Sequence, residues 1–172
     1  MDTSIGTPNI ATTSSSDHRA HRFDDRLREG EHIWTTLGFR RLAWSEGSTT
    51  IEWDATAAYG FPTAGGSLIH GGMITTILDT AMGGACWSVL DEHEAFLTAD
   101  LRVEFLRATR VGTVRATGSV VRRTRKIVFC EAQLHDEAGT LLAASRCTQV
   151  VLSADGAAGR YNEQRIAEDA RG

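Results

Sequence analysis

Long hydrophobic runs, cysteine and net charge are all scarce in this chain of 172 residues. No apolar segment approaches the roughly 18 residues of a membrane-spanning helix, so the sequence predicts no membrane partner. A net charge of −4 argues against a general nucleic-acid binder, because phosphate backbones attract basic surfaces. The N-terminus lacks the charged and then apolar pattern of a secretion signal, and we therefore expect a cytoplasmic protein.

Cysteine and histidine are placed in ways that disfavour disulfide, thiol and metal chemistry. Cys86, Cys130 and Cys147 are odd in number and lie in apolar segments, which predicts reduced core residues. No histidine is near Cys86 in sequence, so a cysteine nucleophile is disfavoured. The histidines show no ligand-like pairing apart from His18 and His21, and we expect neither a metal nor a cofactor.

Composition divides the chain into three parts. Residues 1–20 are rich in Ser, Thr and Asp with little to bury, and we expect them to be disordered. Residues 21–152 form one domain's length, with a short helix predicted at Phe23–Glu29. Residues 153–172 are a polar tail, either disordered or a frayed helix.

The strongest local pattern is a helix that follows Leu68 and ends before Leu90. Apolar residues recur at the three- and four-residue spacing of a helix: Met73, Ile74, Ile77, Leu78, Ala81, Met82 and Ala85. Gly71 and Gly72 open this helix, and Asp79 lies two turns in, nearly opposite the centre of the apolar stripe. The helix therefore buries one side in a core, where its many small residues let a sheet approach, and it turns a carboxylate elsewhere.

Strand patterns surround the helix. Six segments show them: 37–44, 49–55, 95–106, 113–122, 127–135 and 141–152. In the third segment the alternation places Leu97, Ala99 and Leu101 on one face and Thr98 on the other, whereas residues 59–67 are glycine-rich and predict a loop. Short connections predict an antiparallel run, and one helix with about six such strands is an α+β architecture.

The triplet His70-Gly71-Gly72, with an acid nine residues after the histidine, resembles hotdog-fold thioesterases of the phenylacetate-pathway (PaaI-like) type. The similarity covers roughly residues 37–152 and continues in Thr98-Ala99-Asp100-Leu101 and in Phe105-Leu106-Arg107. It implies a six-stranded antiparallel sheet wrapped around one long central helix. It also implies a homodimer or a dimer of dimers, with acyl-CoA hydrolysed to free acid and CoA at the subunit interface.

The resemblance also assigns roles to four residues. The Gly71 N–H, at the positive end of the helix, would polarise the thioester carbonyl, while Asp79 would activate water or attack the carbonyl itself. Thr98 would orient the water, and His70 would shape the glycine turn and the pocket. Each also has a plain structural reading: glycines that ease a turn, an acid hydrogen-bonded between subunits, an ordinary strand threonine and a histidine with a purely structural role.

One position departs from the family pattern. Many relatives have an asparagine six residues before the histidine, which helps to polarise the carbonyl, and this chain has Ala64 there. Thr63 or Ser67 would substitute, or the oxyanion would depend on Gly71 alone. Ser67 and Gly72 are therefore candidate substrate contacts.

A basic cluster is the candidate site for the phosphates of CoA. Arg122, Arg123, Arg125 and Lys126 lie at the predicted turn between two strands, where family members often bind the nucleotide. Guanidinium groups bind phosphate in a bidentate manner, although a solvated hairpin end is the alternative reading.

Two other functions remain open on the sequence alone. One is a non-catalytic acyl-CoA-binding hotdog protein, and the other is a hotdog dehydratase acting on 3-hydroxyacyl thioesters, which uses a histidine base. The acyl preference is also open: Trp53, Phe61 and Trp87 would favour aromatic or medium-length groups, or they belong to the core.

Overall fold

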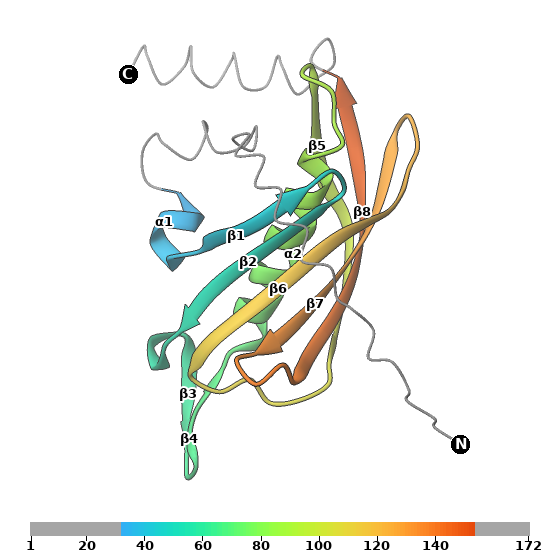
Figure 1. Cartoon of the computed structure of the whole chain (residues 1–172). Helices are drawn as coiled ribbons and strands as arrows, with labels where there is room; N and C mark the ends of the chain where they lie inside the picture. The colour runs from blue at the N-terminus through green and yellow to red at the C-terminus, as the bar shows by residue number, and fades with distance from the viewer. Residues whose placement is uncertain (1–31, 154–172) are drawn as a thin grey trace, which may run out of the picture.

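An antiparallel six-stranded sheet curves around one long helix in the computed structural model, which describes residues 32–153 (Figure 1). The predicted α+β class and central helix are confirmed. The predicted arm at 1–20, the helix at Phe23–Glu29 and the tail that follows Ser153 lie outside the described residues.

The sheet has the strand order β1-β2-β6-β7-β8-β5, and all neighbours are antiparallel. Its strands are β1 (Arg40–Ser45), β2 (Ser48–Ala55), β5 (Glu94–Phe105), β6 (Gly112–Arg123), β7 (Ile127–Asp136) and β8 (Leu141–Ser153). Although β5 and β6 are joined by a short link, they are not neighbours, because β5 pairs with β8 at the far edge. The link at 106–111 therefore crosses the lower end of the molecule instead of forming a hairpin (Figure 1).

The backbone of the central helix α2 (Gly71–Trp87) packs directly against the sheet. A Cβ added at Gly118 of β6 would lie 2.4 Å from the carbonyl of Ala81, and one at Gly84 would lie 2.8 Å from the Thr49 side chain. Larger residues at these positions would hold the layers apart. The small residues therefore set the spacing between helix and sheet, as the sequence predicts.

The three cysteines are free and buried in the core between helix and sheet, as predicted. A hydrogen bond with Cys147 lowers the pKa of Cys130. The contact with Cys86 and burial outweigh that effect and raise the pKa to about 12. A hydrogen bond with Cys130 and burial also raise the pKa of Cys147, so the Cys130 and Cys147 thiols are neutral at physiological pH.

Two segments before α2 differ from the prediction. Residues 59–67, predicted as a loop, lie mostly in a two-stranded hairpin of β3 (Gly60–Thr63) and β4 (Gly66–Ile69), which follows the short helix η2 (Ala57–Tyr59). Gly66 adopts a φ of 104°, which closes the turn. Most of the hairpin is exposed, so its strands carry no alternating apolar pattern that would reveal them.

The segment before β1 also folds differently from the prediction, which began a strand at residue 37. The helix α1 (Ile33–Leu37) stands there, and Gly38 ends it in the left-handed conformation, with a φ of 73°. Its Trp34 is buried and contacts Phe39 edge-on at 6.2 Å.

A β-bulge in β5 corrects the predicted alternation of that strand. The register with β8 shifts between Thr98 and Asp100, so the side chains before and after Ala99 follow different phases. As a result Phe96 and Thr98 face the helix, whereas Leu97, predicted to be on the apolar face, is 64% exposed. The bulge is what turns Thr98 toward α2.

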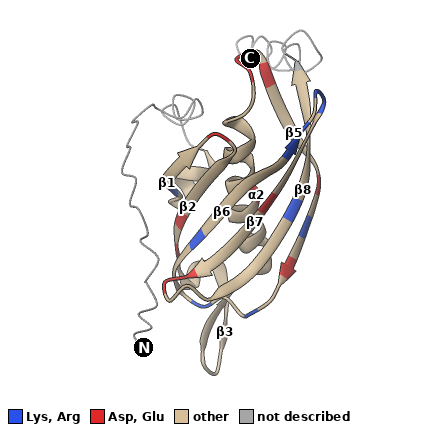
Figure 2. Cartoon of the chain, turned by 45° about the vertical axis from the view of Figure 1, so that its right-hand side comes forward, with Lys and Arg blue, Asp and Glu red and all other residues tan. Residues whose placement is uncertain are grey.

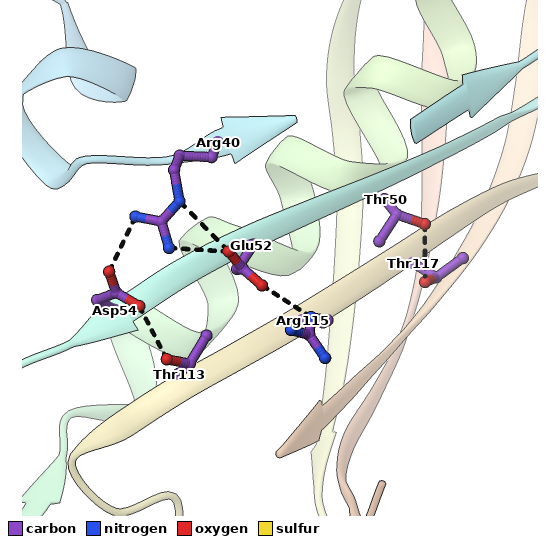
Figure 3. A network of polar contacts seen from close by, with 7 residues as sticks. All are labelled: Arg40, Thr50, Glu52, Asp54, Thr113, Arg115 and Thr117. Atoms are coloured by element: carbon purple, nitrogen blue, oxygen red, sulfur yellow. Dashed lines mark hydrogen bonds and ion pairs between the residues drawn. The ribbon is translucent and has the colours of Figure 1, made fainter. Parts of the chain in front are cut away.

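The outer face of the sheet is polar and ion-paired (Figure 3). Arg40 bonds Glu52 and Asp54, Arg115 bonds the second oxygen of Glu52, and Thr113 donates to Asp54. The hydrogen bonds from Arg40 and then Arg115 hold the pKa of Glu52 below its usual value. Charged residues recur across this face (Figure 2).

Candidate active site

The beginning of α2 leaves one backbone donor free. His70 is the N-cap, and its Nδ1 accepts the Gly72 N–H at 2.8 Å. The Gly71 N–H, the first of the helix, has no acceptor among residues 32–153. His70 thus orients the glycine turn, and the free amide points out from the positive end of the helix dipole.

A cavity of about 360 Å³ lies beside Gly71. Its walls include Leu68, Ile74, Phe105 and Leu106, so it is largely apolar. The Phe105 ring approaches within 3.1 Å of the point where a Cβ at Gly71 would stand. Only glycine leaves this amide open to a second group at close range.

Asp79 lies in the middle of α2 and accepts a hydrogen bond of 3.1 Å from the Thr98 hydroxyl. The carboxylate is half-buried, and burial raises its pKa, an effect that the Thr98 bond partly opposes. A carboxylate with a raised pKa is a stronger base toward water. The structure thus brings together two of the residues that the sequence singled out.

Gly71 and Asp79 of the same chain lie too far apart to act on one atom. Eight residues of helix separate them, which corresponds to about 12 Å along the axis. The cavity at Asp79, of about 140 Å³, has no lining residue in common with the one at Gly71. One thioester carbonyl therefore cannot contact both groups of the same chain.

The other residues predicted around the oxyanion lie on the β3–β4 hairpin. Thr63 donates to the Gly66 carbonyl inside the turn, so its hydroxyl is already engaged. Ala64 is exposed at the tip, and Ser67 is half-buried on β4. Neither Thr63 nor Ser67 lines the cavity at Gly71.

The predicted phosphate cluster lies at the opposite end of α2 from Gly71. Arg123 donates to the Val89 carbonyl and pairs with Glu94 and Asp91. It therefore ties the β6–β7 turn to the segment after the helix. The remaining cluster residues, Arg122, Arg125 and Lys126, are exposed at that turn.

Three residues near Asp79 escaped the sequence reasoning. Trp34 belongs to α1, a helix that the sequence analysis did not predict, and the bulge reversed the face of Phe96. Gln149 is fully buried on β8, directly across from Thr98, and its amide donates to the Cys147 sulfur at 3.4 Å. A lone polar residue at an inward position of a strand was the available signal for Gln149.

A sheet wrapped around one helix, with a capped glycine turn and an acid eight residues after the free amide, defines a hotdog domain. Residues 66–143 match the family model of the Thioesterase superfamily.

Sequence relatives agree with this match. The medium/long-chain acyl-CoA thioesterase YigI of Escherichia coli K12 is 34% identical over 98 residues. That match spans 49% of this chain and 63% of the relative's length.

Solved structures share the fold. A thioesterase family protein from Silicibacter pomeroyi has a TM-score of 0.67 and 25% identity, covering 76% of this chain and 94% of that one. The Escherichia coli PaaI protein from the phenylacetic acid degradation operon has a TM-score of 0.69, covering 79% and 95%. Its 21% identity shows the fold alone.

Neither a membrane-spanning helix nor a metal site is found in the part of the chain that the structure describes. Within residues 32–153, no helix combines the length and apolar character that crossing a bilayer requires. The same residues contain no group of three or more His, Cys, Asp or Glu side chains arranged to hold a metal ion.

Proposed function

We propose that this protein is a homodimeric hydrolase of acyl-CoA thioesters. The observation that carries the proposal is the hydrogen bond between Asp79 of α2 and Thr98 of β5. The same helix presents the free Gly71 amide at its start. The family match and the named relatives agree with that chemistry. Reduced, buried cysteines fit a cytoplasmic location.

In the proposed reaction Asp79 takes a proton from a water held by Thr98, and the water oxygen attacks the thioester carbon. The carbonyl oxygen becomes an oxyanion that accepts the Gly71 N–H, a type of contact worth about 3–4 kcal/mol in the transition state. The C–S bond then breaks, and the proton on Asp79 passes to the leaving thiolate. Direct attack by Asp79, through an anhydride that water later hydrolyses, is the alternative route for the same residues.

The proposed dimer forms along β5. This strand of 12 residues is an edge of the sheet, and it exposes Leu97 by 64% and Phe105 by 57%. A long apolar edge strand with unpaired backbone groups is a template for pairing with another chain. A two-fold pairing would let Asp79 of one copy face Gly71 of the other, closing the gap that the helix leaves.

Substrate contacts complete the proposal. Gly72 and Ser67 would contact the substrate near the thioester, with His70 holding the turn. Arg122, Arg125 and Lys126 would bind the phosphates of CoA, while Arg123 positions their turn through its bonds to Glu94 and Asp91. CoA belongs to the substrate, and no further cofactor enters the reaction.

The test is thiol release from a panel of acyl-CoAs by the wild-type chain and by Asp79→Asn. We expect hydrolysis by the wild type and a loss of at least about a hundredfold in the variant, with folding and dimerisation unchanged. Glu137→Gln, at the exposed turn between β7 and β8, is the control for loss of a carboxylate and should keep full activity. Near-normal turnover by Asp79→Asn would remove this carboxylate from the mechanism.

The same panel separates the two rival functions. Binding without thiol release would indicate an acyl-CoA-binding protein. Formation of an enoyl thioester from 3-hydroxyacyl-CoA, with no release of CoA, would indicate a dehydratase.

A further inference from the structure

The small cavity at Asp79 has aromatic walls contributed by three separate elements. It measures about 140 Å³ and is lined by Trp34 of α1, Trp87 of α2 and Phe96 of β5, together with Thr80 and two glycines of α2. Among the residues that the structure describes, Asp79 is the only ionisable one in the lining. A cavity with aromatic walls beside the proposed catalytic carboxylate is suited to an uncharged group next to the reacting bond.

The walls are held in place by contacts outside the cavity. Trp87 and Phe96 meet at 5.5 Å between ring centroids, with their planes 66° apart. Trp34 is 9% exposed and packs on Phe39, and the guanidinium of Arg41 lies 5.1 Å from its ring centroid. Trp34 is therefore a fixed wall, because moving it would break contacts with two other residues.

A glycine of α2 keeps the cavity open. A Cβ at Gly83 would lie 3.2 Å from the tip of the Phe96 ring, so any side chain there would occupy the space beside that ring. The neighbouring Gly84 is different, because Thr49 already fills the space beside it. Gly83 thus sets the room available in the cavity, whereas Gly84 sets the distance to the sheet.

We propose that this cavity is the acyl subsite, and that Trp34 and Gly83 restrict it to short or single-ring acyl groups. The inference rests on the proposed thioesterase function. Its volume of about 140 Å³ is close to the roughly 150 Å³ of an engineered apolar cavity that binds one benzene molecule. The relative YigI is named for medium and long chains, so this chain would differ from it in acyl length.

The experiment compares kcat/KM for butyryl-, phenylacetyl-, decanoyl- and palmitoyl-CoA. We expect the wild type to prefer butyryl- or phenylacetyl-CoA over palmitoyl-CoA by at least about tenfold, the discrimination typical of an apolar pocket. Trp34→Leu should open the wall and raise the decanoyl-to-butyryl ratio about tenfold. Gly83→Ala should lower the ratio of phenylacetyl- to butyryl-CoA, because the methyl group fills the same space.

Two controls separate specificity from folding. Gly83→Ala introduces a better helix former, so its fold should survive even if Trp34→Leu unfolds. Phe129→Leu changes an aromatic residue that is 40% exposed and lines no part of the Asp79 cavity, and it should leave every ratio unchanged.

Different failures have different meanings. Preference of the wild type for palmitoyl-CoA, or unchanged ratios in a folded Gly83→Ala variant, would place the acyl group elsewhere and leave the hydrolase proposal intact. No hydrolysis of any of the four thioesters would overturn both proposals.

Discussion

At the scale of single residues, the central feature is a carboxylate whose ionised form the fold disfavours. Burial raises the pKa of Asp79, and a hydrogen bond from the Thr98 hydroxyl opposes this shift. The raised pKa has two consequences for this carboxylate. It costs folding free energy when ionised, and for the same reason it accepts a proton more readily from water.

The pH dependence of catalysis follows from that raised pKa. In the proposed reaction Asp79 acts as a base only when ionised, so kcat/KM should fall as pH decreases through a value above about 3.9, the ordinary pKa of aspartate. Thr98→Ala removes the bond that lowers the pKa and should move this acidic limb to higher pH. Thr98→Ser keeps the hydroxyl and should restore the wild-type profile, whereas identical profiles for all three proteins would argue against a bond to the catalytic base.

The stability of the fold depends on pH in the opposite direction to activity. The pKa of Asp79 is higher in the folded chain than in the unfolded chain, so the folded chain binds the proton more tightly. Stability therefore falls as pH rises through the range between these two pKa values. Above it, Asp79→Asn removes a half-buried charge and should leave the thermal midpoint unchanged or higher. A clear drop in that midpoint at neutral pH would mean that the ionised carboxylate supports the fold.

At the scale of elements, contact between α2 and β6 positions the helix that carries the site. The two backbones meet where Gly118 faces Ala81, and no side chain separates them. This close contact between α2 and β6 fixes both the direction of the Gly71 amide and the position of Asp79 opposite β5. The bulge at Ala99 supplies the second alignment, by turning Thr98 toward the helix.

Gly118→Ala tests this contact. The added methyl group would lie 2.4 Å from the Ala81 carbonyl, a clash with backbone that cannot rotate away, and we expect a loss of about 1–3 kcal/mol in unfolding free energy. The matched control is Gly65→Ala on the exposed hairpin, where the nearest atom is 3.6 Å away. Urea denaturation should distinguish them, and equal stabilities would show that helix and sheet separate at little cost.

At the scale of the whole molecule, the proposed site is divided between two copies. The 12 Å or so between Gly71 and Asp79 along one helix is too long for one thioester carbonyl, and the β5 edge offers the surface for pairing. Each dimer would then hold two sites, each built from the Gly71 of one copy and the Asp79 of the other. This arrangement makes a prediction that a site within one chain does not share.

Mixing two inactive variants should restore activity. A chain with Asp79→Asn and a chain with Gly71→Val each lose both sites as homodimers, but their heterodimer regains one intact site. Refolding them together in equal amounts makes half of the dimers mixed, so the expected recovery is about a quarter of wild-type turnover. No recovery, with mixed dimers demonstrated by a tag on one chain, would mean that both groups act within one copy.

Features that depend only on residues close in sequence could be predicted from the sequence alone. The spacing of apolar residues, the glycine pair at Gly71 and the position of Asp79 follow from helix periodicity, which repeats within the segment itself. The inward faces of β6 and β7 and the reduced cysteines follow from alternation and burial in the same way, and the structure agrees. The resemblance of His70-Gly71-Gly72 to the family was visible at this level too.

Packing between distant segments decided the rest. The bulge at Ala99 arises from pairing with β8, so the sequence of β5 alone assigned Leu97 to the wrong face. Trp34 reaches the Asp79 cavity, and Arg123 meets Glu94, because chain segments far apart in sequence are brought together by the sheet. Periodicity carries no information on such contacts, since each depends on which strand lies beside which, and only the tertiary structure sets that order.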